Sequence, residues 1–268
     1  MTTPDRMVTS SDGTPIAVFS SGSGPPLILV HGAAADHTTF RVIGPTLAKR
    51  YTIHAIDRRG RGASGDAVPY AIEREFEDVA AVAEGLAREV AGPVDVVGHS
   101  YGARCALGAA LLTDAIRRVV SYEGAPAPEQ LRYGDVALAD ELADLDRAGR
   151  HEEVLETFLT RVVGMDDAAL AAYRADPVWP DRVAAAHTIP RELRSEGDAA
   201  AGLERLGRVR QPVLQVLGGD SLPVFAEATT ALDRRLTDGR VVVIDGARHA
   251  AHHTHPEAVV AAIRAFLA

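Results

Sequence analysis

The distribution of apolar residues along the chain predicts a sheet of buried strands. Continuous apolar runs cover residues 26–32, 51–57, 94–100, 117–124, 212–219 and 240–246. A run without polar alternation is typical of a strand in a parallel sheet, which helices cover on both faces. Before these runs, residues 6–20 predict two short strands joined by a turn at Asp12-Gly13.

Amphipathic segments fill the gaps between the runs and predict helices. In the longest, residues 73–90, Phe76, Val79, Ala83 and Leu86 return at the spacing of one helix face. Further helices are expected over residues 40–49, 103–112, 224–236 and 256–267. Strands that alternate with helices predict an α/β fold, here a mostly parallel, doubly wound sheet of eight strands with helices on both faces.

One long insertion interrupts this alternation. Residues 125–211, after the sixth expected strand, contain no buried strand and have the pattern of several amphipathic helices, one of them capped by Asp166 or Asp167. An insertion at the carboxyl end of a parallel strand lies where open α/β sheets bind ligands. We therefore expect residues 1–124 and 212–268 to form the core, and residues 125–211 to form a helical lid, or cap.

Composition and charge narrow the class of protein. The chain has 268 residues and a formal net charge of −9. The absence of a dense run of Lys or Arg argues against binding to nucleic acid or to a membrane surface, and no apolar stretch approaches the roughly 20 residues of a membrane span. Cys105 is the only cysteine and the start of the chain is polar, so a cytoplasmic protein is expected. The expected partner is a small-molecule substrate; monomer and homo-oligomer both stay open.

Candidate chemistry centres on Gly98-His99-Ser100-Tyr101-Gly102, between the third buried run and the helix that follows it. A nucleophile in such a position stands at the apex of a sharp, strained turn, and its neighbours two residues away must be small because strand and helix crowd together. The N–H groups at the start of the helix favour negative charge developing nearby. This context predicts that Ser100 is a nucleophile.

Four motifs, in this order, resemble the α/β-hydrolase fold family over nearly the whole chain. They are His31-Gly32 after the first buried run, the loop of residues 57–64 (DRRGRGAS), the Gly98–Gly102 turn, and residues 246–267, where a histidine precedes the last helix. The resemblance implies a cofactor-independent enzyme that uses a serine, a histidine and a carboxylate. Because Ser100 stands where the similar haloalkane dehalogenases and epoxide hydrolases have a carboxylate, attack on an acyl carbon is favoured over those two activities.

The resemblance places the catalytic histidine at His249, directly after the last expected strand. A histidine is the natural base for a serine hydroxyl because its pKa lies near neutrality. His252, His253 and His255 are close competitors in sequence. A metal site at these four histidines is disfavoured, because no cysteine or carboxylate joins them at a ligand spacing.

An oxyanion hole needs two N–H groups directed at one point. The first is expected from Tyr101, the residue after the nucleophile. The second is expected from Ala33, in the loop after His31-Gly32. Small side chains at residues 33–35 leave room for a substrate to approach this backbone.

Two carboxylates compete for the third place beside the histidine. The usual acid of the family follows the seventh strand, where the spacing from Gly218 points to Ser221, so Asp220 arrives one residue early. The other candidate is Glu123, after the sixth strand, where some haloalkane dehalogenases carry their acid. A charge that closes an apolar run is costly to bury without a partner. We favour Glu123 and keep Asp220 as the second choice.

Five further residues are candidates for contact with the substrate. Asp36 and His37 follow the oxyanion loop, although they also fit as caps of the helix near Phe40. Tyr133 and Trp179 lie in the expected cap, and Phe225 follows the seventh strand.

We predict a cofactor-independent serine hydrolase that acts on an ester, lactone or thioester of a small to medium-sized molecule. His249 would take the proton of Ser100 as Ser100 attacks the carbonyl, and water would then release the acyl-enzyme. A second hypothesis keeps the fold but changes the reaction to that of a C–C bond hydrolase, lyase or cyclase of a natural-product pathway. A third is a ligand-binding receptor with slow turnover, against which the intact serine–histidine pair argues.

Overall fold

A computed structural model describes residues 3–128 and 130–268, and within these ranges an eight-stranded sheet forms the centre of the molecule. The strands follow the order β1-β2-β4-β3-β5-β6-β7-β8 across it. β1 and β2 pair antiparallel, β2 joins β4 antiparallel, and all other neighbours are parallel. This confirms the predicted mostly parallel α/β sheet. The strand bounds are β1 Arg6–Thr9, β2 Pro15–Gly22, β3 Pro26–Val30, β4 Thr52–Ile56, β5 Val94–His99, β6 Ile116–Tyr122, β7 Val213–Gly218 and β8 Gly239–Ile244.

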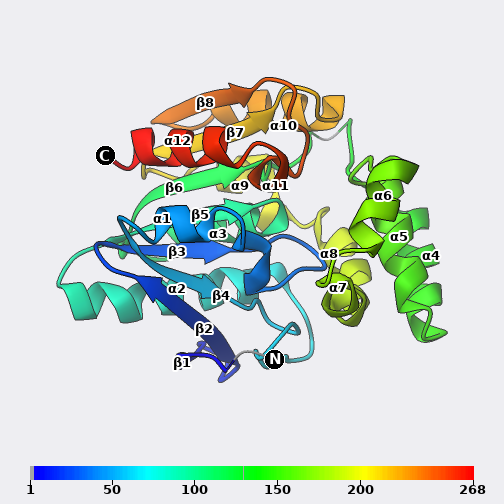
Figure 1. The fold of residues 1–268 in the computed structure, drawn as a ribbon, viewed down its shortest axis with the longest axis horizontal. Helices are drawn as coiled ribbons and strands as arrows, with labels where there is room; N and C mark the ends of the chain where they lie inside the picture. The colour runs from blue at the N-terminus through cyan, green and yellow to red at the C-terminus, as the bar shows by residue number, and fades with distance from the viewer. Residues whose placement is uncertain (1–2, 129) are drawn as a thin grey trace.

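Helices cover both faces of the sheet, as the continuous apolar runs predict (Figure 1). The exception is the edge strand β8, where residues 240–243 are exposed although their apolar run predicts a buried strand. In β3, Ile28 and Val30 join one buried cluster, while Leu27 and Leu29 join another on the opposite face. The first cluster includes residues of α2 (Ile72–Val90), α3 (Tyr101–Ala110) and α10 (Pro223–Asp233). The second includes residues of α1 (Gly44–Leu47) and α12 (Pro256–Phe266), and α11 (Ala251–Thr254) precedes α12.

The expected helix over residues 40–49 is wrong in its extent. A 3-10 helix covers His37–Phe40, and α1 begins only at Gly44. Pro45 accounts for the break, because it lacks a backbone N–H and fits only the first turn of a helix. In the described residues, no helix combines the length and the apolar character needed to cross a membrane.

Residues 125–211, which we call the cap segment, run between β6 and β7. Their described part contains α4 (Val136–Arg147), α5 (His151–Arg161), α6 (Asp167–Arg174), α7 (Trp179–Ala185), α8 (Ile189–Ser195), α9 (Leu203–Leu206) and two 3-10 turns. Asp166 accepts a hydrogen bond from the N–H of Ala169 and so caps α6, as its position suggests. Figure 1 shows α4–α8 gathered beside the end of the sheet toward which the β3 arrow points.

Buried ion pairs hold the cap segment to the core. Glu192 of α8 pairs with Arg58 and Arg61, from the loop after β4, and Arg58 also makes two bonds of 2.7 and 2.8 Å to Glu75 of α2. All four side chains are at most 2% exposed. Two arginines thus balance two glutamates at this junction, which satisfies the charges that burial would otherwise penalise.

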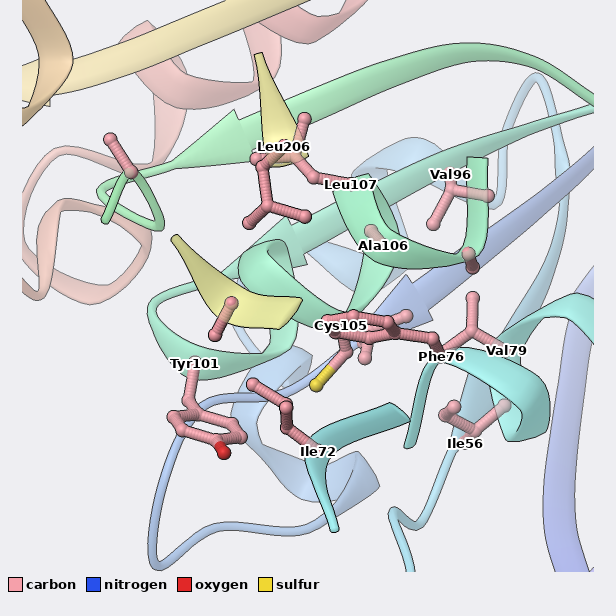
Figure 2. Packing of buried hydrophobic residues seen from close by; sticks show 14 of the residues in the cluster. Ile56, Ile72, Phe76, Val79, Val96, Tyr101, Cys105, Ala106, Leu107 and Leu206 are labelled. Atoms are coloured by element: carbon pink, nitrogen blue, oxygen red, sulfur yellow. The ribbon is translucent and has the colours of Figure 1, made fainter. Parts of the chain in front are cut away.

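Close packing between α2 and α3 gives a stability prediction. A Cβ atom on Gly108 of α3 would lie 2.3 Å from the ring of Phe76 of α2. Figure 2 shows Phe76 packed in the same buried cluster as Cys105 and Ala106 of α3. Gly108→Ala is therefore expected to lower the free energy of unfolding by about 1–3 kcal/mol. Gly85→Ala on α2 is the matched control, because its Cβ would enter open space. This substitution is expected to raise the free energy of unfolding by up to about 1 kcal/mol. Urea unfolding followed by circular dichroism measures both free energies. If the two substitutions change the free energy of unfolding in the same direction, the packing argument is contradicted.

Candidate active site

Ser100 lies at the sharp turn between β5 and α3. Its backbone has φ 54° and ψ −127°, which is a strained conformation for a residue with a side chain. The turn leaves no space beside it: a Cβ on Gly98 would lie 2.3 Å from the Cα of Ala103, and one on Gly102 would lie 2.1 Å from the carbonyl oxygen of His31. The two glycines thus allow the close approach of strand and helix that lifts Ser100 out of the sheet.

Glu123 meets His249 across the ends of β6 and β8. The Nδ1 of His249 lies 2.5 Å from Oε2 of Glu123, and the two side chains are 9% and 0% exposed. Glu123 has φ 47°, so it also occupies a turn that residues with side chains rarely adopt. With the Nδ1–H donated to the carboxylate, the Nε2 of His249 is left as an acceptor.

Two donors from the end of β7 hold the other oxygen of Glu123. The N–H of Gly218 and the hydroxyl of Ser221 lie 2.8 and 2.6 Å from Oε1. Ser221 thus occupies the position where the spacing from Gly218 points to an acid, and it binds the carboxylate that comes from β6. Asp220 is exposed, and its backbone N–H bonds the carbonyl of Ala247. The carboxylate that reaches His249 is that of Glu123.

The loop that carries His249 is fixed by its neighbours. The hydroxyl of Tyr122, at the end of β6, donates to the carbonyl of Arg248 at 2.6 Å and accepts from the N–H of Ala251 at 2.7 Å. The backbone is therefore tied to Tyr122 both before and after His249. His99 donates from Nε2 to the carbonyl of His249 at 2.9 Å. This places His99 beneath the turn as a packed residue.

His99, His252 and His253 have environments that disfavour their charged forms. Burial lowers the pKa of His99 and of His252 well below the usual value. Burial, together with the positive charges of Arg41 and Arg182, lowers the pKa of His253 to about 4. His255 bonds its neighbour Thr254 through Nδ1 at 2.9 Å.

Ser100, Glu123 and His249 line one cavity between the core and the cap segment. Ala33 and Tyr101, the two candidate oxyanion donors, also line it, together with Tyr133 and Phe225. The ring of Phe225 lies 4.6 Å from that of His249 and 5.0 Å from that of Tyr133. The cavity has a volume of about 30 Å³, which is room for a few waters. Entry of a larger molecule thus requires side chains or cap helices to move.

Three of the sequence-predicted contact residues lie elsewhere. Asp36 caps the 3-10 helix through the N–H of Thr38 and pairs with Arg182 of the cap segment at 2.7 Å. His37 stacks on Phe19 and bonds Asp57 at 2.8 Å, and both Asp36 and His37 line a separate hollow. Trp179 packs against Tyr173 and donates to Glu152 at 2.9 Å. The structure therefore corrects their expected placement beside Ser100.

Sequence reasoning missed a group of charged residues in the same cavity: Arg104, Glu192 and Glu196. A signal for Arg104 was present, because it lies in the first turn of the helix that follows Ser100. The two glutamates belong to α8 and its C-cap, at the end of the cap segment. Their contact with Ser100's cavity depends on how the cap packs, which the local pattern does not encode.

Comparisons with known proteins agree with this architecture. A model of the alpha/beta hydrolase family matches residues 27–262. The pimeloyl-[acyl-carrier protein] methyl ester esterase of Neisseria meningitidis (serogroup B, strain H44/76) is 29% identical over 247 residues, which cover 89% of this chain and 91% of that protein. The (E)-2-((N-methylformamido)methylene)succinate hydrolase of Acinetobacter baylyi is 25% identical over 252 residues, 93% of this chain and 92% of that protein. Among solved structures, an alpha/beta hydrolase from Sphaerobacter thermophilus has a TM-score of 0.81 and 31% identity, and the match covers 96% of this chain and all of that one.

Proposed function

This chain belongs to the alpha/beta hydrolase family, and on that premise we propose that it is a serine hydrolase of a carboxylic ester, lactone or thioester of a small to medium-sized molecule. The observation that carries the proposal is the set of groups on one cavity: Ser100 on its strained turn, with His249 bonded to Glu123 at 2.5 Å. Serine, imidazole and carboxylate in this arrangement are what acyl transfer requires.

In the proposed reaction, Ser100 attacks the carbonyl carbon of the substrate and its proton passes to Nε2 of His249. Glu123 holds the imidazole in the tautomer that accepts this proton and stabilises the cation that forms. His249 then gives the proton to the leaving alcohol or thiol, and an acyl-enzyme remains. Water attacks the acyl carbon, passes its proton to His249, and the acid leaves as Ser100 regains its proton.

The backbone N–H groups of Tyr101 and Ala33 are the proposed oxyanion hole. Tyr101 is the first residue of α3, so its N–H has no acceptor within that helix, and the positive end of the helix dipole favours an oxyanion there. Ala33 lies on the same cavity, in the loop after β3, the strand next to β5 in the sheet. Each such donor contributes about 10²–10³ in kcat in related chemistry.

The cap segment and the relatives support a small substrate. Tyr133, Phe158 and Leu193 of the cap segment line the same cavity as Ser100, and a cavity bounded by the cap suits a compact acyl compound better than a polymer. Two relatives are named for the hydrolysis of a methyl ester and of a succinate derivative. We treat residues 125–211 as the part of the chain that selects the substrate.

The experiment that tests the proposal combines labelling with turnover. An alkyl fluorophosphonate is expected to add one phosphonyl group per chain, on the peptide that contains Ser100, and to abolish hydrolysis of short methyl esters and thioesters in buffer without added cofactor. Modification of Ser100 without turnover on any ester, lactone or thioester of the panel would instead support the non-hydrolytic enzyme or the receptor. Absence of labelling at Ser100 would overturn the nucleophile assignment.

A further inference from the structure

Arg104 is a buried cation on the proposed active-site cavity, and among the described residues it has only long polar contacts and the ring faces of Tyr101 and Tyr133, 5.7 and 5.6 Å away. Its side chain is 4% exposed and lines the same cavity as Ser100. Its nearest acceptors are distant: Glu196 at 3.6 Å from Nη1 and the carbonyl of Ala125 at 3.5 Å from Nη2. The hydroxyl of Tyr133 already donates to that carbonyl at 2.7 Å. The Nε–H of Arg104 is buried without a hydrogen-bond partner among the described residues.

Arg58 and Arg59 show how a buried arginine is satisfied, whereas Arg61, which also has an unpartnered Nε, still bonds Glu192 and the carbonyl of Arg59 through its Nη atoms. Arg58 makes two short bonds to Glu75, and Arg59 makes two bonds of 2.7 Å to Asp78. A guanidinium offers five N–H donors in a planar fork that fits a carboxylate. Burying it without such a partner is costly. The unfilled donors of Arg104 therefore point to a ligand that supplies the missing oxygens.

We propose that Arg104 binds a carboxylate of the substrate, so that the enzyme acts on half-esters, or equivalent lactones or thioesters, of short dicarboxylic acids. This deepens the proposed function and rests on it. Arg104 lies in the first turn of α3, directly after the turn that carries Ser100, and both residues line the same cavity. Because the cavity that both residues line is small, an acyl chain held at Ser100 needs only a short spacer to bring a free carboxylate to the guanidinium.

The charges around the cavity leave Arg104 available for an anion. Glu192 also lines the cavity, with Oε2 unpartnered, but Arg58 and Arg61 balance its charge. Glu196 is the carboxylate of the chain that would compete with a substrate anion for Arg104. Burial and the negative charge of Glu192 raise the pKa of Glu196 to about 7, against the opposing effect of Arg104 and Arg132. As pH falls through this pKa, Glu196 takes up a proton and compensates less of the charge of Arg104. Above pH 7 the Glu196 carboxylate competes with the substrate, so preference for the anion falls as pH rises.

The test compares monomethyl glutarate with methyl pentanoate, two methyl esters of similar length that differ in the distal carboxylate. Methanol release gives kcat/KM for each, and their ratio cancels the pH dependence that both share through His249. The wild-type ratio is expected to favour the anionic ester about ten- to hundredfold at pH 6 and to decrease toward pH 8. Arg104→Gln is expected to lower the ratio at least tenfold, and Arg104→Lys to restore part of it.

Glu196→Gln is the sharper variant, because it removes the competing carboxylate and keeps Arg104. It is expected to raise the ratio at pH 8 and to flatten its dependence on pH. Arg194→Gln, an exposed arginine of α8 that pairs with Asp140, is the matched control and leaves the ratio unchanged. A wild-type ratio near one, or a ratio in Glu196→Gln that keeps the wild-type pH dependence, overturns the carboxylate site while hydrolysis of methyl pentanoate still supports the proposed function.

A binding experiment tests the carboxylate site at Arg104 independently of the proposed hydrolase activity. Glutarate is expected to raise the Tm of the wild type at pH 6, whereas pentanamide is not, and Arg104→Gln is expected to lose the glutarate effect. If neither ester is hydrolysed but glutarate still stabilises the protein through Arg104, the hydrolase proposal fails and the carboxylate site stands. If glutarate has no effect on the wild type and the esters are cleaved at equal rates, the carboxylate site fails.

Discussion

Ser100→Ala is expected to reduce kcat for ester hydrolysis by about five to six orders of magnitude. Without the hydroxyl no acyl-enzyme can form, and only the oxyanion donors and substrate binding continue to assist attack by water. KM is expected to change little, because the hydroxyl contributes little to binding of the ground state. Single-turnover and steady-state kinetics on a methyl ester measure both quantities.

The fold is expected to survive this substitution. Alanine keeps the Cβ of serine, so the strain of a backbone at φ 54° is the same in both, and the free energy of unfolding is expected to stay within about 1 kcal/mol of the wild type. Ser121→Ala is the control, since Ser121 is a buried serine of β6 that does not line the cavity. It keeps phosphonate labelling and turnover, both of which Ser100→Ala loses. Retention of more than a few per cent of kcat in Ser100→Ala would remove Ser100 from the mechanism.

The sheet was predictable because its information is local. Each buried strand is an unbroken apolar run, since both of its faces must exclude water, and β3 shows this with alternate residues serving two clusters. The turn at Ser100 was also predictable, because Gly98 and Gly102 mark a backbone that admits no Cβ. The short α1 was not predicted in its extent, although Pro45 carried the signal for it.

Features that depend on the packing of the cap were beyond local reasoning. The ion pair between Asp36 and Arg182 joins the loop after β3 to α7, and only the folded chain shows that Asp36 lines a different hollow from Ser100. Likewise, Arg104 becomes notable only when its neighbours are seen to leave its Nε–H unpartnered. The acid of the triad was predictable only in part. The sequence named both residues, and the structure brings Glu123 to His249 while Asp220 is exposed.

Glu123→Gln is expected to lower kcat by about 10³–10⁴ while Asp220→Asn stays within about twofold of the wild type. The carboxylate of Glu123 accepts from Nδ1–H of His249 and so selects the tautomer whose Nε2 can take a proton. The amide of Gln can instead donate to Nδ1, which puts the proton on Nε2 and blocks its role as a base. It also removes the negative charge that stabilises the imidazolium, and loss of both effects accounts for the size of the decrease.

The hydrogen bonds to Oε1 of Glu123 make Glu123→Gln a test of catalysis rather than of folding. Gln keeps the volume of Glu, and its carbonyl oxygen can still accept from the N–H of Gly218 and from Ser221, which lie 2.8 and 2.6 Å from Oε1. Urea unfolding is therefore expected to show a much smaller effect than kcat. The exposed side chain of Asp220 is the matched acid at the neighbouring strand end. If Asp220→Asn instead loses most of kcat and Glu123→Gln does not, Asp220 is the triad acid, and the bond between Glu123 and His249 only positions the loop after β8.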